Sequence, residues 1–144
     1  MEMPADPKPA AGMEKPRSRL LLAAGALLVI CLGLAIRSRY LGVPRFPSKY
    51  GGDALWALMI VIFTAFVFPR LRMGRVALIS LAICCAVEFS QIYHAPWIDA
   101  IRRSRPGALI LGSVFSWWDM VAYAAGVAVG WAAGLALPPR FIRR

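Results

Sequence analysis

The segment that decides the fold reads VALISLAICCAVEFSQ and runs from Val76 to Gln91. It carries no charge until Glu88, near its end. Three other long stretches are equally free of charge: Leu20–Ile36, Ala54–Phe68 and Val121–Leu137. Each stretch, with its semi-polar ends, approaches the roughly 20 residues that an α-helix needs to cross a bilayer. The sequence therefore predicts an all-α polytopic membrane protein with four transmembrane helices, embedded in the lipid bilayer.

The composition supports membrane insertion and argues against a soluble, nucleic-acid-binding domain. The chain has 144 residues, 60% of them hydrophobic, and its 17 Lys and Arg against 7 Asp and Glu give a net charge of +10. A soluble domain is typically closer to half apolar. The arginines flank the apolar stretches, as in membrane helices, instead of forming a basic patch on a soluble surface. We therefore expect no nucleic-acid partner.

The cysteines and the histidine do not predict a metal site. Cys31, Cys84 and Cys85 all lie within apolar stretches, where cysteine packs as a small apolar residue. His94 is the only histidine of the chain, and nothing near it has the spacing of metal ligands. We expect no metal and no cofactor.

The two ends of the chain differ in composition from the apolar stretches. Residues 1–19 contain four prolines among charges and alanines, which predicts a disordered cytoplasmic tail. The first apolar stretch resembles a secretory signal, but it exceeds the usual core of roughly 7–15 residues and has no Ala-x-Ala cleavage site at its end, directly before Arg37. We therefore expect an uncleaved first helix, a single transmembrane domain over residues 20–137, and a basic C-terminal tail over residues 138–144.

Prolines, glycines and charges mark the connections between the first predicted helices. Residues 37–52 contain two prolines and the pair Gly51-Gly52, which predict a loop. Asp53 then precedes the second apolar stretch, where the simplest interpretation is an N-cap that accepts hydrogen bonds from free backbone N–H groups. A short basic turn, Pro69–Arg75, joins the second and third helices.

The second half of the chain is predicted to contain two long helices with an irregular segment between them. The third helix is expected over Val76–His94, ending before the next proline. Trp97–Arg105 has apolar residues on one side and charged residues on the other, which predicts a short interfacial helix. Ala108–Val114 is apolar but too short to span, so we expect a re-entrant turn or a partly buried loop. The fourth helix is expected from about Trp118 to the proline pair that follows residue 137.

Small residues recur at every fourth position of the last helix. They are Ala122, Gly126, Gly130 and Gly134. A repeated small-xxx-small stripe lets another helix approach closely, so this face is expected to pack against a helix. Packing within the chain is the favoured interpretation, but the pattern does not distinguish it from a homo-oligomer or a membrane partner.

Four spans place both termini on the same side of the membrane. With the termini inside, ten Lys and Arg residues lie in inner segments and seven in outer segments. This bias agrees with the positive-inside rule, so we predict that both termini are cytoplasmic.

Polar residues of the predicted helices then meet at the outer end of the bundle. Glu88 and Gln91 share a helix face at i, i+3 spacing, and Asp99 and Arg102 have the same spacing and are expected to pair. Ionisable residues within apolar segments are costly, which makes them candidates for a functional site. Glu88 and Asp119 are the candidate catalytic residues, although a structural bond between Glu88 and an arginine explains Glu88 equally well. The candidate ligand-binding residues are Arg37, Arg39, Asp53, Glu88, Gln91, Asp99, Arg102 and Asp119.

Four segments resemble an uncharacterised family of bacterial inner-membrane proteins, a domain of unknown function that is distantly similar to the VanZ-like proteins. The segments are Lys49–Ala57, Val87–Gln91, Trp97–Arg102 and Leu111–Gly126. The VanZ-like pattern is a Glu-x-x-Gln on one helix, followed by an Arg and then by an Asp with downstream glycines. It matches Glu88, Gln91, Arg102, Asp119, Gly126 and Gly130. VanZ is associated with resistance to glycopeptide antibiotics, so the resemblance implies the inner membrane and a role in the cell envelope.

Three functions fit these observations. The first is binding of an anionic lipid or lipid-linked headgroup at the outer leaflet, because guanidinium groups suit phosphate. The second is a scaffold or assembly role, in which the glycine face of the last helix holds a partner. The third, less favoured, is an enzyme that acts on a lipid-linked substrate with Glu88 or Asp119 as general base.

Overall fold

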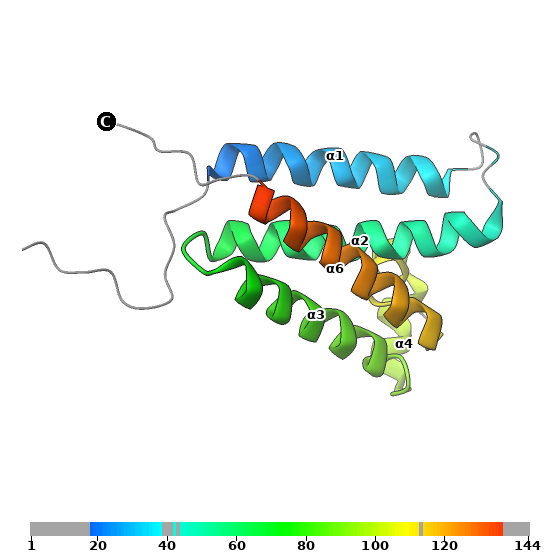
Figure 1. Ribbon diagram of the computed structural model, residues 1–144. Helices are drawn as coiled ribbons and strands as arrows, with labels where there is room; N and C mark the ends of the chain where they lie inside the picture. The colour runs from blue at the N-terminus through cyan, green and yellow to red at the C-terminus, as the bar shows by residue number, and fades with distance from the viewer. Residues whose placement is uncertain (1–17, 39–41, 43, 113, 137–144) are drawn as a thin grey trace, which may run out of the picture.

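The computed structural model describes residues 18–38, 42, 44–112 and 114–136, which form six helices and no strand (Figure 1). The helices are α1 (Arg19–Arg37), α2 (Arg45–Val67), α3 (Met73–Ser90), α4 (Pro96–Arg103), α5 (Arg105–Leu111) and α6 (Trp117–Ala136). Four of these, α1, α2, α3 and α6, are long and apolar enough to cross a bilayer, which confirms the predicted all-α polytopic membrane fold. The predicted tails lie outside the described residues, except for Ser18, which is the N-cap of α1, and Arg19, which begins that helix.

Helix α2 lies at the centre of the bundle. It packs against α1, α3 and α6, and α6 also packs against α3. The core between α2, α3 and α6 consists of small and aliphatic side chains such as Ala57, Val61, Val76 and Val127. Large apolar residues such as Leu78 are exposed on the outside. Exposed apolar surface costs about 25 cal/mol per Å² in water but nothing comparable against lipid tails, so this pattern fits four membrane spans.

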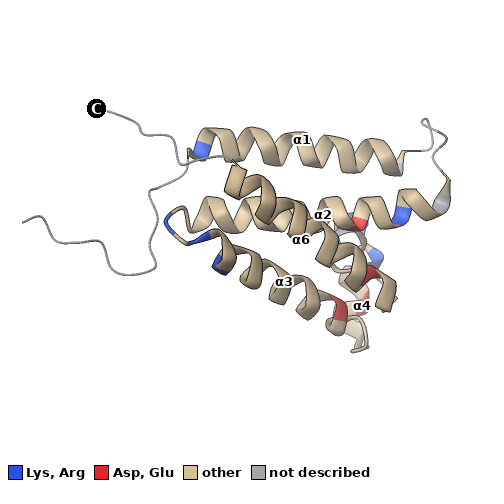
Figure 2. Cartoon of the chain, in the orientation of Figure 1, with Lys and Arg blue, Asp and Glu red and all other residues tan. Residues whose placement is uncertain are grey.

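The two ends of the bundle differ in charge. The start of α1, the α2–α3 turn and the end of α6 lie at one end, which we call the arginine end because the turn carries Arg70, Arg72 and Arg75 (Figures 1 and 2). The opposite end, called the polar end, holds the start of α2, the end of α3, helices α4 and α5, and the start of α6. The described part of the chain contains four acids, and all four lie at the polar end: Asp53, Glu88, Asp99 and Asp119 (Figure 2).

Helix α2 begins at Arg45, well before the expected start at Ala54. Pro47 lies in its first turn, where a proline gives up no intrahelical hydrogen bond. The two glycines that follow cost about 1 kcal/mol each relative to alanine, but most helix stability in proteins comes from packing, and α2 is packed on three sides. Asp53 therefore lies inside α2, and its predicted role as the N-cap of this helix is wrong.

Helix α3 lies a few residues earlier than predicted, because it begins at Met73, within the predicted basic turn, instead of at Val76. It ends at Ser90 instead of His94, and the next two residues form a turn. Pro96, which was expected to stop this helix, lies in the first turn of α4. A proline is favoured there because the first N–H groups of a helix have no intrahelical acceptor.

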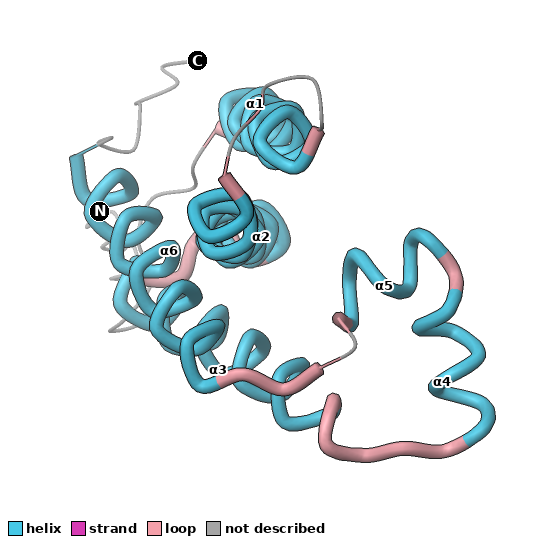
Figure 3. Tube along the Cα trace, turned by 90° about the vertical axis from the view of Figure 1, so that its right-hand side faces the viewer, coloured by secondary structure: helices cyan, strands magenta, loops and turns pink. Residues whose placement is uncertain are grey.

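The segment after α3 forms two short helices that lie to one side of the bundle (Figure 3). The predicted interfacial helix corresponds to α4 and ends at Arg103. The side-chain oxygen of Ser104 then accepts a hydrogen bond from the backbone N–H of Gly107 at 3.1 Å and caps α5. Arg105-Pro106-Gly107 therefore opens a helix instead of only breaking one, and the segment expected to be a re-entrant turn begins as α5.

The small-residue face of α6 packs against helices of the same chain. A Cβ atom added at Gly126 would collide with the backbone carbonyl of Ala54, and one at Gly130 would lie 2.9 Å from a valine side chain of α2. A Cβ atom added at Gly134 would likewise collide with the side chain of Met73 at the start of α3. Ala122 is buried. These contacts occupy the glycines within the chain, so the face is not available to a homo-oligomer or a membrane partner.

Candidate functional site

A cavity of about 300 Å³ lies at the polar end of the bundle. Its polar and aromatic lining comes from α2, the end of α3 and α6, and consists of Lys49, Asp53, Trp56, Gln91, Asp119 and Tyr123. Small and apolar residues of α5 and the following loop complete the lining: Ala108, Ile110, Gly112 and Val114. The cavity is therefore polar on the side of the bundle and apolar on the side of α5.

Glu88 lies behind this lining and connects three parts of the chain. Its side chain is fully buried. Its Oε1 accepts a hydrogen bond from the backbone N–H of Ser116 at 2.7 Å. Its Oε2 accepts from Gln91 Nε2 at 3.0 Å and from the Tyr123 hydroxyl at 3.2 Å. Since Gln91 and Tyr123 both line the cavity, the Glu88 carboxylate holds two of its polar walls in place without facing it.

An ion pair within the cavity lining joins α2 to α6. Lys49 Nζ donates to Asp119 Oδ1 at 2.8 Å and lies 5.0 Å from the ring centroid of Tyr50. The Asp119 side chain is 8% exposed, whereas that of Lys49 is 49% exposed. Asp53 follows Lys49 by one helical turn on the same face of α2 and is buried. The described lining thus contains two carboxylates and one ammonium group.

Gly112 shapes the cavity where α5 ends. Its φ of +65° is a conformation that favours glycine, and an added Cβ would lie 2.6 Å from Gln91 Nε2. The glycine therefore lets the chain pass directly over the Gln91 amide that is bonded to Glu88.

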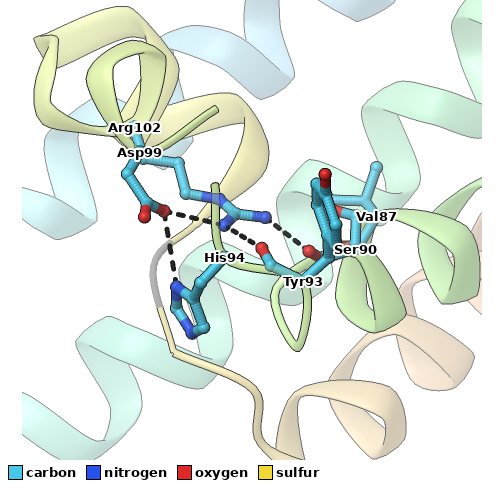
Figure 4. Close-up of polar contacts among 6 residues, drawn as sticks. All are labelled: Val87, Ser90, Tyr93, His94, Asp99 and Arg102. Carbon is cyan, nitrogen blue, oxygen red and sulfur yellow. Dashed lines mark hydrogen bonds and ion pairs between the residues drawn. The ribbon is translucent and has the colours of Figure 1, made fainter. Parts of the chain in front are cut away.

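Asp99 and Arg102 form a separate cluster outside the cavity, at the junction of α3 and α4 (Figure 4). Arg102 Nη1 donates to the backbone carbonyl of Tyr93 at 2.8 Å, and Nη2 donates to that of Ser90 at 2.6 Å. The pair expected from the i, i+3 spacing is present, with Nη1 at 3.3 Å from Asp99 Oδ1. His94 Nδ1 lies 3.4 Å from the same oxygen. Arg102 is thus directed at the carbonyl groups that end α3.

Replacing Arg102 with alanine is expected to lower the free energy of unfolding by about 2–3 kcal/mol, because carbonyls at the end of α3 would lose a charged donor. Arg103, its exposed neighbour, provides a matched control, and Arg103→Ala should change stability by no more than about 0.5 kcal/mol. Denaturant unfolding of both variants in detergent micelles measures the difference. Equal stability of the two variants would contradict the capping role of Arg102.

The structure separates the predicted site residues into distinct groups. Asp53, Gln91 and Asp119 line the cavity, Glu88 lies behind it, and Asp99 and Arg102 lie apart from it. Arg37 ends α1, but its side chain and the whole of Arg39 are outside the described part of the chain. In the described residues, no group of three or more His, Cys, Asp or Glu side chains could hold a metal ion.

Three residues of the polar and aromatic lining were not predicted from the sequence as site residues: Lys49, Trp56 and Tyr123. Lys49 precedes Asp53 by four residues, a spacing that places both on one helix face. That signal is visible only if α2 is extended back to Arg45. Trp56 and Tyr123 lie in apolar stretches, where an aromatic residue is ordinarily part of the packing.

The comparisons with known proteins identify a family but no solved structure. No solved structure matches the chain. A family model described as "Protein of unknown function (DUF2809)" matches residues 42–127. This range contains all of the residues that line the cavity, together with Glu88. The chain therefore belongs to the DUF2809 family of proteins of unknown function.

Proposed function

We propose that the protein binds the phosphate-bearing headgroup of a membrane lipid or lipid-linked molecule in the cavity at the polar end. The observation that carries the proposal is a cavity lined by charged residues at the end of an otherwise apolar bundle. Charged residues in membrane helices are costly and usually serve a function. The apolar wall of α5 suits the acyl part of such a ligand, and the opposite wall suits its headgroup.

We further propose that the polar end lies in the outer leaflet of the bacterial inner membrane. Over the whole sequence, ten Lys and Arg lie in the segments predicted to be on the side of the arginine end and seven in those on the other side, and this bias supports a cytoplasmic arginine end by the positive-inside rule. The resemblance to VanZ-like proteins supports a role in the cell envelope. In this orientation the cavity would meet lipids of the outer leaflet.

Lys49 is the residue best placed to contact the phosphate group. The sequence suggested arginines for this role, but Arg102 is buried and directed at the end of α3. Lys49 lines the cavity, is half-exposed, and carries three donors on a flexible side chain. The exposed Arg103 and Arg105 of the neighbouring short helices would add to the attraction of an anionic headgroup.

The Lys49→Gln variant tests the proposal. Loss of a charged hydrogen bond of about 1.5–3 kcal/mol should lower phospholipid affinity by about tenfold or more. Native mass spectrometry of the detergent-extracted protein measures the retained phospholipid. Arg70→Gln removes an exposed positive charge at the arginine end and should retain phospholipid like the wild type. Equal retention by Lys49→Gln and the wild type would contradict the proposal.

The alternative functions have less support in the geometry. Glu88 is fully buried behind Gln91 and Tyr123, so of the two candidate general bases only Asp119 faces the cavity. Scaffolding through the glycines of α6 is disfavoured because these glycines contact α2 and α3. Binding of a headgroup requires only residues that already line the cavity.

A further inference from the structure

The cavity lining contains carboxylates as well as an ammonium group. Asp53 and Asp119 contribute two negative charges to the described lining, and Lys49 contributes one positive charge. Glu88 adds a further carboxylate directly behind the lining. A positively charged group of a ligand would be attracted to these carboxylates.

Aromatic side chains provide a second, independent feature of a cation site. Trp56 and Tyr123 both line the cavity, and their ring centroids lie 5.5 Å apart with an angle of 47° between the planes. The faces of tryptophan and tyrosine rings attract ammonium groups, and aromatic side chains are a common element of sites for such ligands. The same wall of the cavity thus offers both carboxylates and aromatic rings.

We propose that the cavity recognises the amine of a zwitterionic phosphoethanolamine-type lipid headgroup. This proposal rests on the proposed function and specifies its ligand. The ammonium group would bind between Asp53 and Asp119, against Trp56 and Tyr123, and the phosphate would bind Lys49. A cavity of about 300 Å³ is at the lower end of the range for small-ligand sites and fits a headgroup of this size.

Lys49 allows the ligand to enter without leaving a charge unpaired. In the structure, its ammonium group is paired with Asp119, and half of its side chain is exposed. The ligand amine would replace it at Asp119, and Lys49 would turn to the ligand phosphate. Asp53 and Lys49 are four residues apart on α2, or about 6 Å along the helix, a separation suited to a phosphate and an amine joined by two carbons.

The test compares three lipids with identical short acyl chains on the delipidated full-length protein. The probes are phosphatidylethanolamine, its N-acetylated derivative, which keeps the phosphate but lacks the positive charge, and phosphatidylglycerol. Titrations followed by native mass spectrometry should show that phosphatidylethanolamine binds about tenfold more tightly than the other two, a factor typical of one lost charged contact. This order opposes the net charge of +10, which by itself favours the two anionic lipids.

Two variants locate the selectivity in the cavity. Asp53→Asn should remove the preference for phosphatidylethanolamine, and Lys49→Gln should weaken binding of all three lipids. Equal affinity for phosphatidylethanolamine and its N-acetylated derivative in the wild type overturns the amine site, and this comparison does not depend on any variant folding. If that equal binding still requires Lys49, the proposed function stands and only the amine site fails. If binding of every lipid is independent of Lys49, both proposals fail.

A final probe separates a lipid from a soluble source of the same headgroup. Free phosphoethanolamine carries the amine and the phosphate but no acyl chains. It should bind more weakly than the short-chain lipid, because the apolar α5 wall would have no acyl chain to contact. Equal affinity would overturn the assignment of the ligand as a lipid.

Discussion

Replacing Gly126 with leucine is expected to prevent the four-helix bundle from forming. A Cβ atom at this position would collide with the carbonyl oxygen of Ala54 and lie 2.9 Å from its carbonyl carbon. These are backbone atoms of α2, so they cannot turn aside as the end of a side chain can. The helices would have to separate, and close approach through small residues is a main source of helix association in membranes. Even Gly126→Ala should therefore cost about 3 kcal/mol, the upper end of the range for overpacking.

Two other glycines serve as controls for Gly126. Gly51 lies in α2 with nothing within 4 Å of an added Cβ, so Gly51→Ala should not destabilise the protein. Gly134→Ala would displace only the flexible side chain of Met73 and should have an intermediate effect. Denaturant unfolding in detergent micelles, followed by circular dichroism, gives the order of stability. Similar unfolding of Gly126→Ala and Gly51→Ala would contradict the close packing of α6 on α2.

Replacing Glu88 with leucine is expected to have the second large effect. Leucine fills similar space but accepts no hydrogen bond, so the Ser116 N–H, the Tyr123 hydroxyl and the Gln91 amide would lose their acceptor. Each unsatisfied buried donor costs about 1–3 kcal/mol, so the total should exceed about 3 kcal/mol. That is a large share of the 5–15 kcal/mol that is typical of a folded domain. We expect the loop before α6 to detach from α3 and the cavity to lose its shape.

The effect of Glu88→Leu can be measured at a single backbone amide as well as in the stability of the whole protein. Amide hydrogen exchange at Ser116 should become faster in Glu88→Leu, because this N–H is bonded to Glu88 Oε1. Tyr123→Phe removes one donor and keeps the carboxylate, so it should cost only about 1 kcal/mol and leave the Ser116 amide protected. Combining Tyr123→Phe with Glu88→Leu should cost less than the sum of the single changes. Unchanged exchange at Ser116 in Glu88→Leu would show that the carboxylate does not hold this loop.

The membrane spans were predictable from the sequence, but the first turns of α2 were not. A charge-free stretch of sufficient length is local information, and a bilayer leaves such a stretch few structures other than a helix. Pro47 and the glycine pair look like a loop when they are considered alone. Packing of α2 against three other helices overrides this local preference, and packing cannot be inferred from the segment itself.

The arrangement of the candidate site also depends on packing that cannot be inferred from a single segment. Glu88 was recognisable because a charge within an apolar stretch is unusual, and Asp53 and Asp119 because they come just before such stretches. Their different positions relative to the cavity depend on contacts between distant segments. Lys49 reaches Asp119 only because α2 extends back past it, and Arg102 reaches the end of α3 only because that helix stops at Ser90.

The hydrogen bonds of Glu88 also have a consequence for the synthesis of the protein. Two of its three donors, Ser116 and Tyr123, belong to segments that are synthesised after α3. Before these segments are inserted, α3 would lie in the membrane with the Glu88 carboxylate bonded, among its described donors, only to Gln91, one turn away. Insertion of α6 supplies these donors and also brings Asp119 to Lys49. The Glu88 carboxylate therefore acquires these two donors only when α6 is in place, and a chain that stops before α6 would expose this carboxylate to lipid.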